Sequence, residues 1–196
     1  MNHFDEYYEL LSAICYEKIK ENLSLESAES LFSDNFIKRI KSDKTTRQHF
    51  IDFQKYYFNL INNPEEIQFK VFKQKYSLQG VTSDYLNKLN FERDKIIGFI
   101  VDDNLAELYF KYFHFQELET KAGNKTKSLG SFFTKLVHTY KPSEYTPVDM
   151  PMKDFFGLNN ESYFVSMIVI SRAFKKWANE NGNIISEFKD LLIDYM

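Results

Sequence analysis

Apolar side chains recur at every third or fourth position along most of this chain, and this spacing restricts the fold to helices that pack through apolar faces. The clearest run reads SYFVSMIVISRAFKKWAN, with Asn160 or Ser162 available as its N-cap and an inner half that is almost entirely apolar. A helix that is apolar on most sides is a central one. We therefore predict an all-α, compact multi-helix single domain over residues 1–196, with a central apolar helix near residues 162–178.

The same helical spacing marks five other stretches of the chain. They are residues 5–21, 43–62, 83–89, 103–118 and 184–195. Two short helices, capped by Ser24 and by Ser33 or Asp34, are expected between the first two stretches. The only cysteine, Cys15, lies on the apolar side of the first stretch, so we expect a buried thiol rather than a nucleophile or metal ligand.

Two stretches fit a helix and a strand equally well. Residues 67–76 alternate apolar and polar side chains after a helix start at Asn63-Pro64-Glu65-Glu66, and residues 95–101 form a short branched apolar run around Gly98. A minor two-stranded element is the alternative that these stretches leave open.

Composition limits the partners that the chain can have. The 20 Phe and 13 Tyr residues indicate a core filled by aromatic rings, and a net charge of -3 argues against coating nucleic acid indiscriminately, while a local basic face remains compatible with it. The chain has no apolar run of the roughly 18 residues that span a bilayer, and its first residues are acidic where a signal peptide is basic. We expect a cytoplasmic protein with no membrane partner.

Most catalytic motifs are absent from the sequence. It contains no phosphate-binding loop, no dinucleotide fingerprint, no His-Glu-x-x-His, no Cys-x-x-Cys and no nucleophile elbow, and its four histidines are far apart. We therefore expect no metal site and no cofactor. One nuclease-like fragment, Glu119-Thr120-Lys121 with Asp102 and Asp103 upstream, has an acid-x-lysine spacing, although the upstream acids also suit the start of a helix.

Lysine, proline and glycine residues are concentrated between Lys121 and Leu158. This segment holds three of the four prolines, three of the six glycines and five lysines before its first acidic residue, Glu144. Such a composition suits loops that bind anions. We predict contacts to nucleic-acid phosphate from a set of basic and N-terminal helix positions: Lys121, Lys125, Lys127, Gly130, Ser131 and Lys135.

Residues 129–158 resemble the signature of the helix-hairpin-helix DNA glycosylase superfamily. Leu129-Gly130 matches the hairpin, Phe132 to Tyr140 the following helix, Pro147-Val148-Asp149 the acidic position and Gly157-Leu158 the end of the motif. The resemblance implies a phosphate held by backbone amides and a catalytic Asp149 that helps to displace a flipped base. Bifunctional members carry a lysine where this chain has Ser131, so strand cleavage is not implied.

A second interpretation assigns the same residues to structure alone. Asp149 followed by Met150 and Pro151 suits a helix N-cap, Gly157 suits a C-cap, and His138 suits a hydrogen-bonded, half-buried position. The chain would then be a non-catalytic protein of a bacterial or phage system that binds a protein partner or a second copy through aromatic side chains. This alternative predicts an exposed Phe/Tyr patch and an Asp149 that caps a helix.

Overall fold

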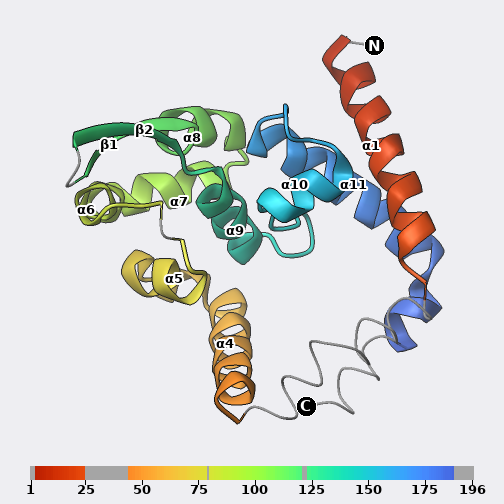
Figure 1. The fold of residues 1–196 in the computed structure, drawn as a ribbon, viewed down its shortest axis with the longest axis horizontal. Helices are drawn as coiled ribbons and strands as arrows, with labels where there is room; N and C mark the ends of the chain where they lie inside the picture. The colour runs from red at the N-terminus through yellow and green to blue at the C-terminus, as the bar shows by residue number, and fades with distance from the viewer. Residues whose placement is uncertain (1–2, 25–43, 79, 121–122, 188–196) are drawn as a thin grey trace. The chain divides into compact units, whose positions relative to one another are not determined.

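The computed structural model describes residues 3–24, 44–78, 80–120 and 123–187 (Figure 1). The chain divides into two compact units, residues 59–168 and residues 1–58 together with 169–196. We call them the inner unit and the terminal unit. The boundary between them falls inside two helices, α4 (Lys44–Asn62) and α11 (Tyr163–Glu180). The expectation that residues 1–196 form one domain stays a prediction.

The described residues are mostly helical, which confirms the predicted fold class. Besides α4 and α11, the elements in chain order are α1 (His3–Asn22), the 3-10 helix η1 (Pro64–Glu66), α5 (Phe69–Lys75), α6 (Ser83–Phe91), α7 (Arg93–Val101), α8 (Leu105–Tyr112), β1 (Phe115–Thr120), β2 (Gly123–Ser128), α9 (Gly130–Tyr140) and α10 (Met150–Phe156). Residues 182–187 are also helical. Within the described ranges, no helix combines the length and the apolar character that a membrane crossing requires.

The described part of the terminal unit consists of α1, residues 44–58 of α4, the second half of α11 and residues 182–187. Arg172 forms an ion pair with Glu9 at 3.5 Å and lies 5.7 Å from the ring centroid of Tyr8, so it joins α11 to α1. Cys15 is fully buried, and this burial raises the pKa of its thiol to about 11. The thiol therefore stays protonated near neutral pH, which confirms the prediction of a buried apolar role. The two short helices predicted after Ser24 lie outside the described residues.

The core of the inner unit is built from aromatic rings, as the composition predicted. The ring of Phe132 on α9 lies 5.8 Å from Phe69 and 5.2 Å from Phe72 on α5, and 5.6 Å from Phe113 after α8. All four side chains are buried. The two contacts with α5 join segments that are about 60 residues apart in the sequence, so α5 is held in place by α9.

Both stretches that the sequence left open are helical. Residues 69–75 form α5 because Phe69 and Phe72, three positions apart, bury one face against Phe132. Residues 95–101 belong to α7, where Ile96 and Ile100 are buried at a spacing of four. The alternating pattern of residues 67–76 comes from Lys70, Lys73 and Lys75, which lie away from the buried phenylalanine face of α5; Lys70 and Lys75 are exposed and Lys73 is half-buried.

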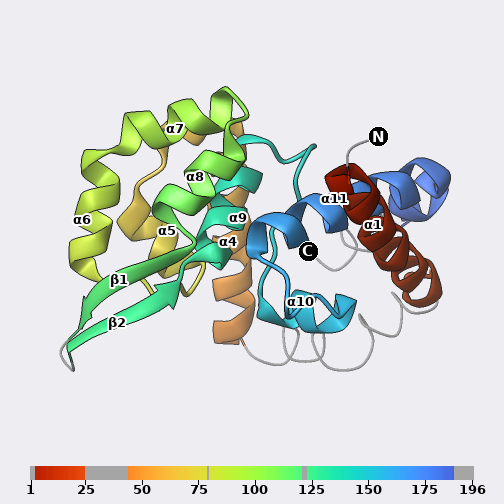
Figure 2. The same ribbon diagram turned by 90° about the horizontal axis from the view of Figure 1, so that it is seen from above.

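The predicted helix over residues 103–118 is wrong in its second half. The helix α8 ends at Tyr112, and residues 115–120 form β1, which pairs antiparallel with β2. The exposure of the side chains alternates along residues 115–119, with Leu118 buried between the exposed Glu117 and Glu119. The expected minor two-stranded element exists, but it lies here, and Figures 1 and 2 both place it on the same side of the inner unit as α6.

Candidate nucleic-acid interface

The β1–β2 hairpin carries the two lysines of the basic segment that lie on a strand. Lys127 pairs with Gln116 and Lys125 pairs with Leu118, and paired residues of an antiparallel ladder point to the same side of the sheet. The carboxylates of Glu117 and Glu119 are therefore on the other side. Lys125 is exposed and Lys127 is half-buried. One face of the hairpin thus carries both lysines and packs on the inner unit through Leu118, which is buried, while the other, exposed face carries the two glutamates.

The first two turns of α9 hold Gly130, Ser131 and Lys135. Gly130 is buried against the ring of Tyr163, and its N–H donates to the Ser128 hydroxyl at 3.3 Å. The Lys135 ammonium donates to the Ser131 hydroxyl at 3.0 Å and lies 5.8 Å from the ring centroid of Tyr76. Burial lowers the pKa of Lys135, and the nearby Asp149 carboxylate opposes this shift.

A buried threonine brings Asp149 beside these residues. The Thr134 hydroxyl accepts from the N–H of Val148 at 3.0 Å and donates to the carbonyl of Val148 at 2.8 Å, which fixes the segment before α10 to α9. Asp149 is the next residue and is half-buried. The structure therefore brings together four of the predicted site residues: Gly130, Ser131, Lys135 and Asp149.

Asp149 is the N-cap of α10. Its carboxylate accepts from the backbone N–H of Met152 at 3.2 Å, Pro151 occupies the first turn, and Gly157 ends the helix with a left-handed φ of 72°. The caps predicted from Asp149 and Gly157 are both confirmed. His138 is half-buried and its Nδ1 donates to the carbonyl of Tyr145 at 2.6 Å, as predicted, and burial lowers its pKa.

Asp149→Ala is expected to lower the free energy of unfolding by about 0.5–2 kcal/mol, because the alanine side chain cannot accept the Met152 N–H. Asp149→Asn retains an acceptor and should cost clearly less. Urea unfolding of the three proteins, followed by circular dichroism, measures both differences. Equal losses in the two variants would show that the capping bond contributes little to stability.

The remaining predicted residues lie elsewhere or are already paired. Lys141 forms an ion pair with Asp103 at 2.7 Å, and Tyr145 also donates to that carboxylate at 3.2 Å. Among the described residues, Asp103 therefore pairs with Lys141 and Tyr145 and not with the nuclease-like fragment that contains Glu119. Lys121 lies outside them. Among the residues that the structure describes, no three His, Cys, Asp or Glu side chains lie close enough together to hold a metal ion.

The sequence interpretation missed a polar groove between α5 and α6. The groove encloses about 350 Å³, and its lining carries two ammonium groups, several amides and no carboxylate. The lining residues are Lys70, Lys73, Gln74, Ser83, Leu86, Asn87 and Asn90. Ser83, Asn87 and Asn90 follow a four- and three-residue spacing that marks one face of a helix, as do Lys70 and Lys73. That signal was readable, but only once residues 69–75 were known to be helical.

Comparisons of the chain with protein-family models, with curated proteins and with solved structures found no match.

Proposed function

We propose that this protein binds nucleic acid through its phosphate backbone and does not act on the bases. The observation that supports this proposal is the basic face of the hairpin, on which Lys125 and Lys127 stand beside the uncharged Leu118 and Gln116. Two ammonium groups on one face of a two-stranded element, about two residues apart, suit successive phosphates of a strand. Because Leu118 on this face is buried, a strand would reach the lysines from the edge of the hairpin, where Lys125 is exposed, and not across the acidic outer face.

In this proposal Asp149 has a structural role and not a catalytic one. Its carboxylate holds the first turn of α10, so we expect the chain to resemble the glycosylase superfamily in how it would hold phosphate rather than in base excision. Incubation with duplexes that contain uracil or oxidised bases should yield no abasic product. Excision by the wild type, lost in Asp149→Asn, would replace this proposal with a catalytic one.

Lys125→Ala/Lys127→Ala is expected to bind a labelled 20-nucleotide single strand or duplex about tenfold more weakly at 50 mM salt, because two phosphate contacts are removed. Fluorescence anisotropy measures the affinity. The matched control is Lys88→Ala/Lys95→Ala, which removes the same charge from α6 and α7 and should bind as the wild type does. Equal weakening in both variants would indicate a dependence on net charge alone and would contradict a hairpin site.

The alternative, a protein-binding function, is favoured by one feature of the surface. Phe110 and Phe115 are 58% and 62% exposed, and both contact the ring of His114, at centroid distances of 5.2 and 4.6 Å. We call these three residues the aromatic patch. Glu117 lies on the same face of the hairpin as Phe115, which disfavours a nucleic-acid partner at this place.

If the aromatic patch joins two copies of the chain, Phe110→Ser/Phe115→Ser should convert a dimer into a monomer, because removing the rings takes away most of the apolar area at the contact. Sedimentation velocity of both proteins checks this. Phe91→Ser is the control, since Phe91 is 91% exposed on α6 and should leave the dimer intact. A wild type that is monomeric at all concentrations would remove self-association as the function of the patch.

A further inference from the structure

The groove between α5 and α6 has the chemistry of a binding site for one particular class of ligand. Lys70 and Lys73 stand one helical turn apart on α5, and both line the hollow of about 350 Å³. The opposite wall, α6, contributes the Ser83 hydroxyl and the side-chain amides of Asn87 and Asn90. Lysine ammonium groups pair with phosphate oxygens as point charges. Amides both donate and accept, which matches the edges of nucleobases.

The apolar floor of the groove and the charges at its far end indicate how a ligand would be oriented in it. Leu86, which is buried, supplies an apolar surface between the amides. A second hollow of about 540 Å³ shares Lys70 and Asn90 with the first and is also lined by Glu65 and Glu66. Arg93 also lines that second hollow, so its two carboxylates are offset by Arg93 and Lys70. The first hollow has two ammonium groups and no carboxylate, so a phosphate would lie there, near Lys73.

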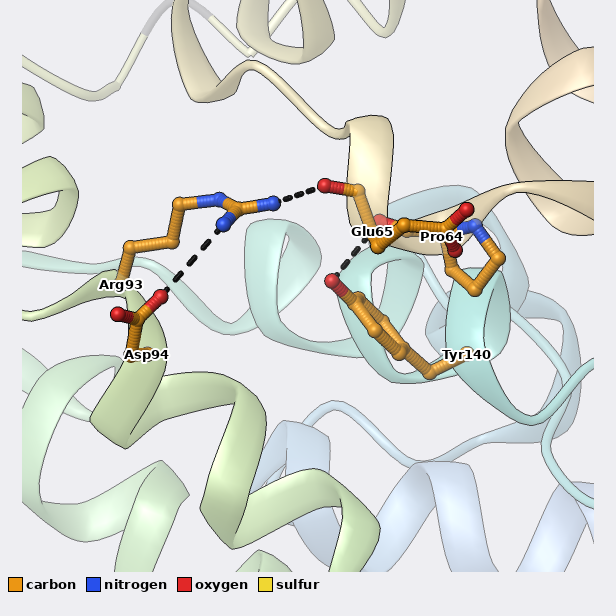
Figure 3. A network of polar contacts seen from close by, with 5 residues as sticks. All are labelled: Pro64, Glu65, Arg93, Asp94 and Tyr140. Carbon is orange, nitrogen blue, oxygen red and sulfur yellow. Dashed lines mark hydrogen bonds and ion pairs between the residues drawn. The ribbon is translucent and has the colours of Figure 1, made fainter.

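The wall that α5 forms is held in place by contacts outside the groove. Figure 3 shows Arg93 donating to the backbone carbonyl of Glu65 and pairing with Asp94 at 3.6 Å, while the Tyr140 hydroxyl donates to the carbonyl of Pro64 at 2.8 Å. These bonds fix η1, which directly precedes α5. On the inner side, α5 is anchored by its phenylalanine rings against α9. The lysines are therefore presented by a helix that is already fixed, which lowers the cost of ordering the site when a ligand binds.

We propose that this groove binds a nucleoside phosphate, either as a free nucleotide or as one unit of a nucleic-acid strand. The volume lies at the lower end of the range of small-ligand sites, roughly 300–1,000 Å³. In its strand form the inference rests on the proposed function, since the groove would then add a second contact region to the hairpin. In its free form it stands independently of that function.

The test is a titration of the full-length, ¹⁵N-labelled protein with each of the four nucleoside monophosphates and, separately, with a 10-nucleotide single strand. Backbone amide shifts over residues 70–74 and 83–90 report occupation of the groove. Lys70→Gln/Lys73→Gln should weaken binding about tenfold or more, and the spectrum shows whether the variant is folded. Lys88→Gln/Lys95→Gln is the charge-matched control and should stay within about twofold of the wild type.

The outcomes separate the two sources of the ligand and the two proposals. Groove shifts with monophosphates that are weakened in the groove variant support a free nucleotide, even if no strand binds and the hairpin proposal fails. Groove shifts with the strand alone, weakened in the same variant, support the strand form. Strand binding that depends on Lys125 and Lys127 but leaves the groove amides unshifted would keep the proposed function and overturn this inference. Absence of groove shifts with every probe, or unchanged affinity in the groove variant, also overturns it.

Discussion

Phe132→Ala is expected to lower the free energy of unfolding by about 3–5 kcal/mol, the range for truncating a buried aromatic side chain. The Phe132 ring is buried and contacts the rings of Phe69, Phe72 and Phe113. Its removal leaves a cavity between three elements that cannot all collapse into it, and α5 loses its anchor. Urea unfolding followed by circular dichroism measures the change.

The control for this variant is Phe110→Ala, which removes the same atoms from a side chain that is 58% exposed. It should change the free energy of unfolding by no more than about 0.5 kcal/mol. Similar losses in the two variants would contradict the placement of Phe132 at the centre of the aromatic core.

Gly130→Ala should destabilise the protein by about 1–3 kcal/mol, because the added methyl group has no room. A Cβ at this position would lie 2.5 Å from the Cβ of Tyr163 and closer still to its ring. The ring is itself held, since the Lys153 ammonium lies 4.6 Å from its centroid. Thermal or urea unfolding would show the loss.

The same substitution at Gly98 should instead raise the free energy of unfolding. Gly98 lies within α7, and a Cβ there would meet no heavy atom within 4 Å apart from its chain neighbours and the backbone of its own helix. Alanine therefore removes backbone freedom from the unfolded chain without a clash, and the expected gain is about 0.5–1 kcal/mol. If Gly130→Ala were also stabilising, Gly130 would not be in close contact with Tyr163, and its predicted contact with phosphate would become the better explanation for a glycine there.

Local sequence was sufficient to predict the long helices and the caps. In α4 and α11 the apolar period runs over many residues, and the N-cap at Asp149 with its left-handed C-cap at Gly157 uses only neighbouring residues. Each of these signals is contained in a segment shorter than about 20 residues, so no tertiary contact is needed to recognise it.

The hairpin and α5 could not be predicted in the same way, because their conformation depends on distant partners. The strand β2 reads GNKTKS and has no apolar residue, so its pairing with β1 through backbone hydrogen bonds leaves no pattern in the side chains. The helix α5 has seven residues and is marginal by itself. It is stabilised by Phe132, about 60 residues further along the chain.

The candidate site was also predictable only where its features depend on local sequence. The nearness of Lys135 to Asp149 follows from the bonds of Thr134 to Val148, which no spacing rule reveals. The groove between α5 and α6 was missed because one of its walls had no assigned conformation. By contrast, the concentration of lysines before Glu144 was visible in composition, but only the register of β1 and β2 shows that Lys125 and Lys127 share a face.

The most direct test of the central claim, that the chain binds nucleic-acid phosphate, is the affinity of the wild type for a labelled oligonucleotide measured from 50 to 300 mM salt. If phosphates are contacted, the logarithm of the association constant should fall linearly with the logarithm of the salt concentration. The slope should become shallower by about 2 in Lys125→Ala/Lys127→Ala, about 1 for each lysine removed. No binding at the lowest salt, or binding that does not respond to salt, would contradict the claim and leave the aromatic patch as the better guide to function.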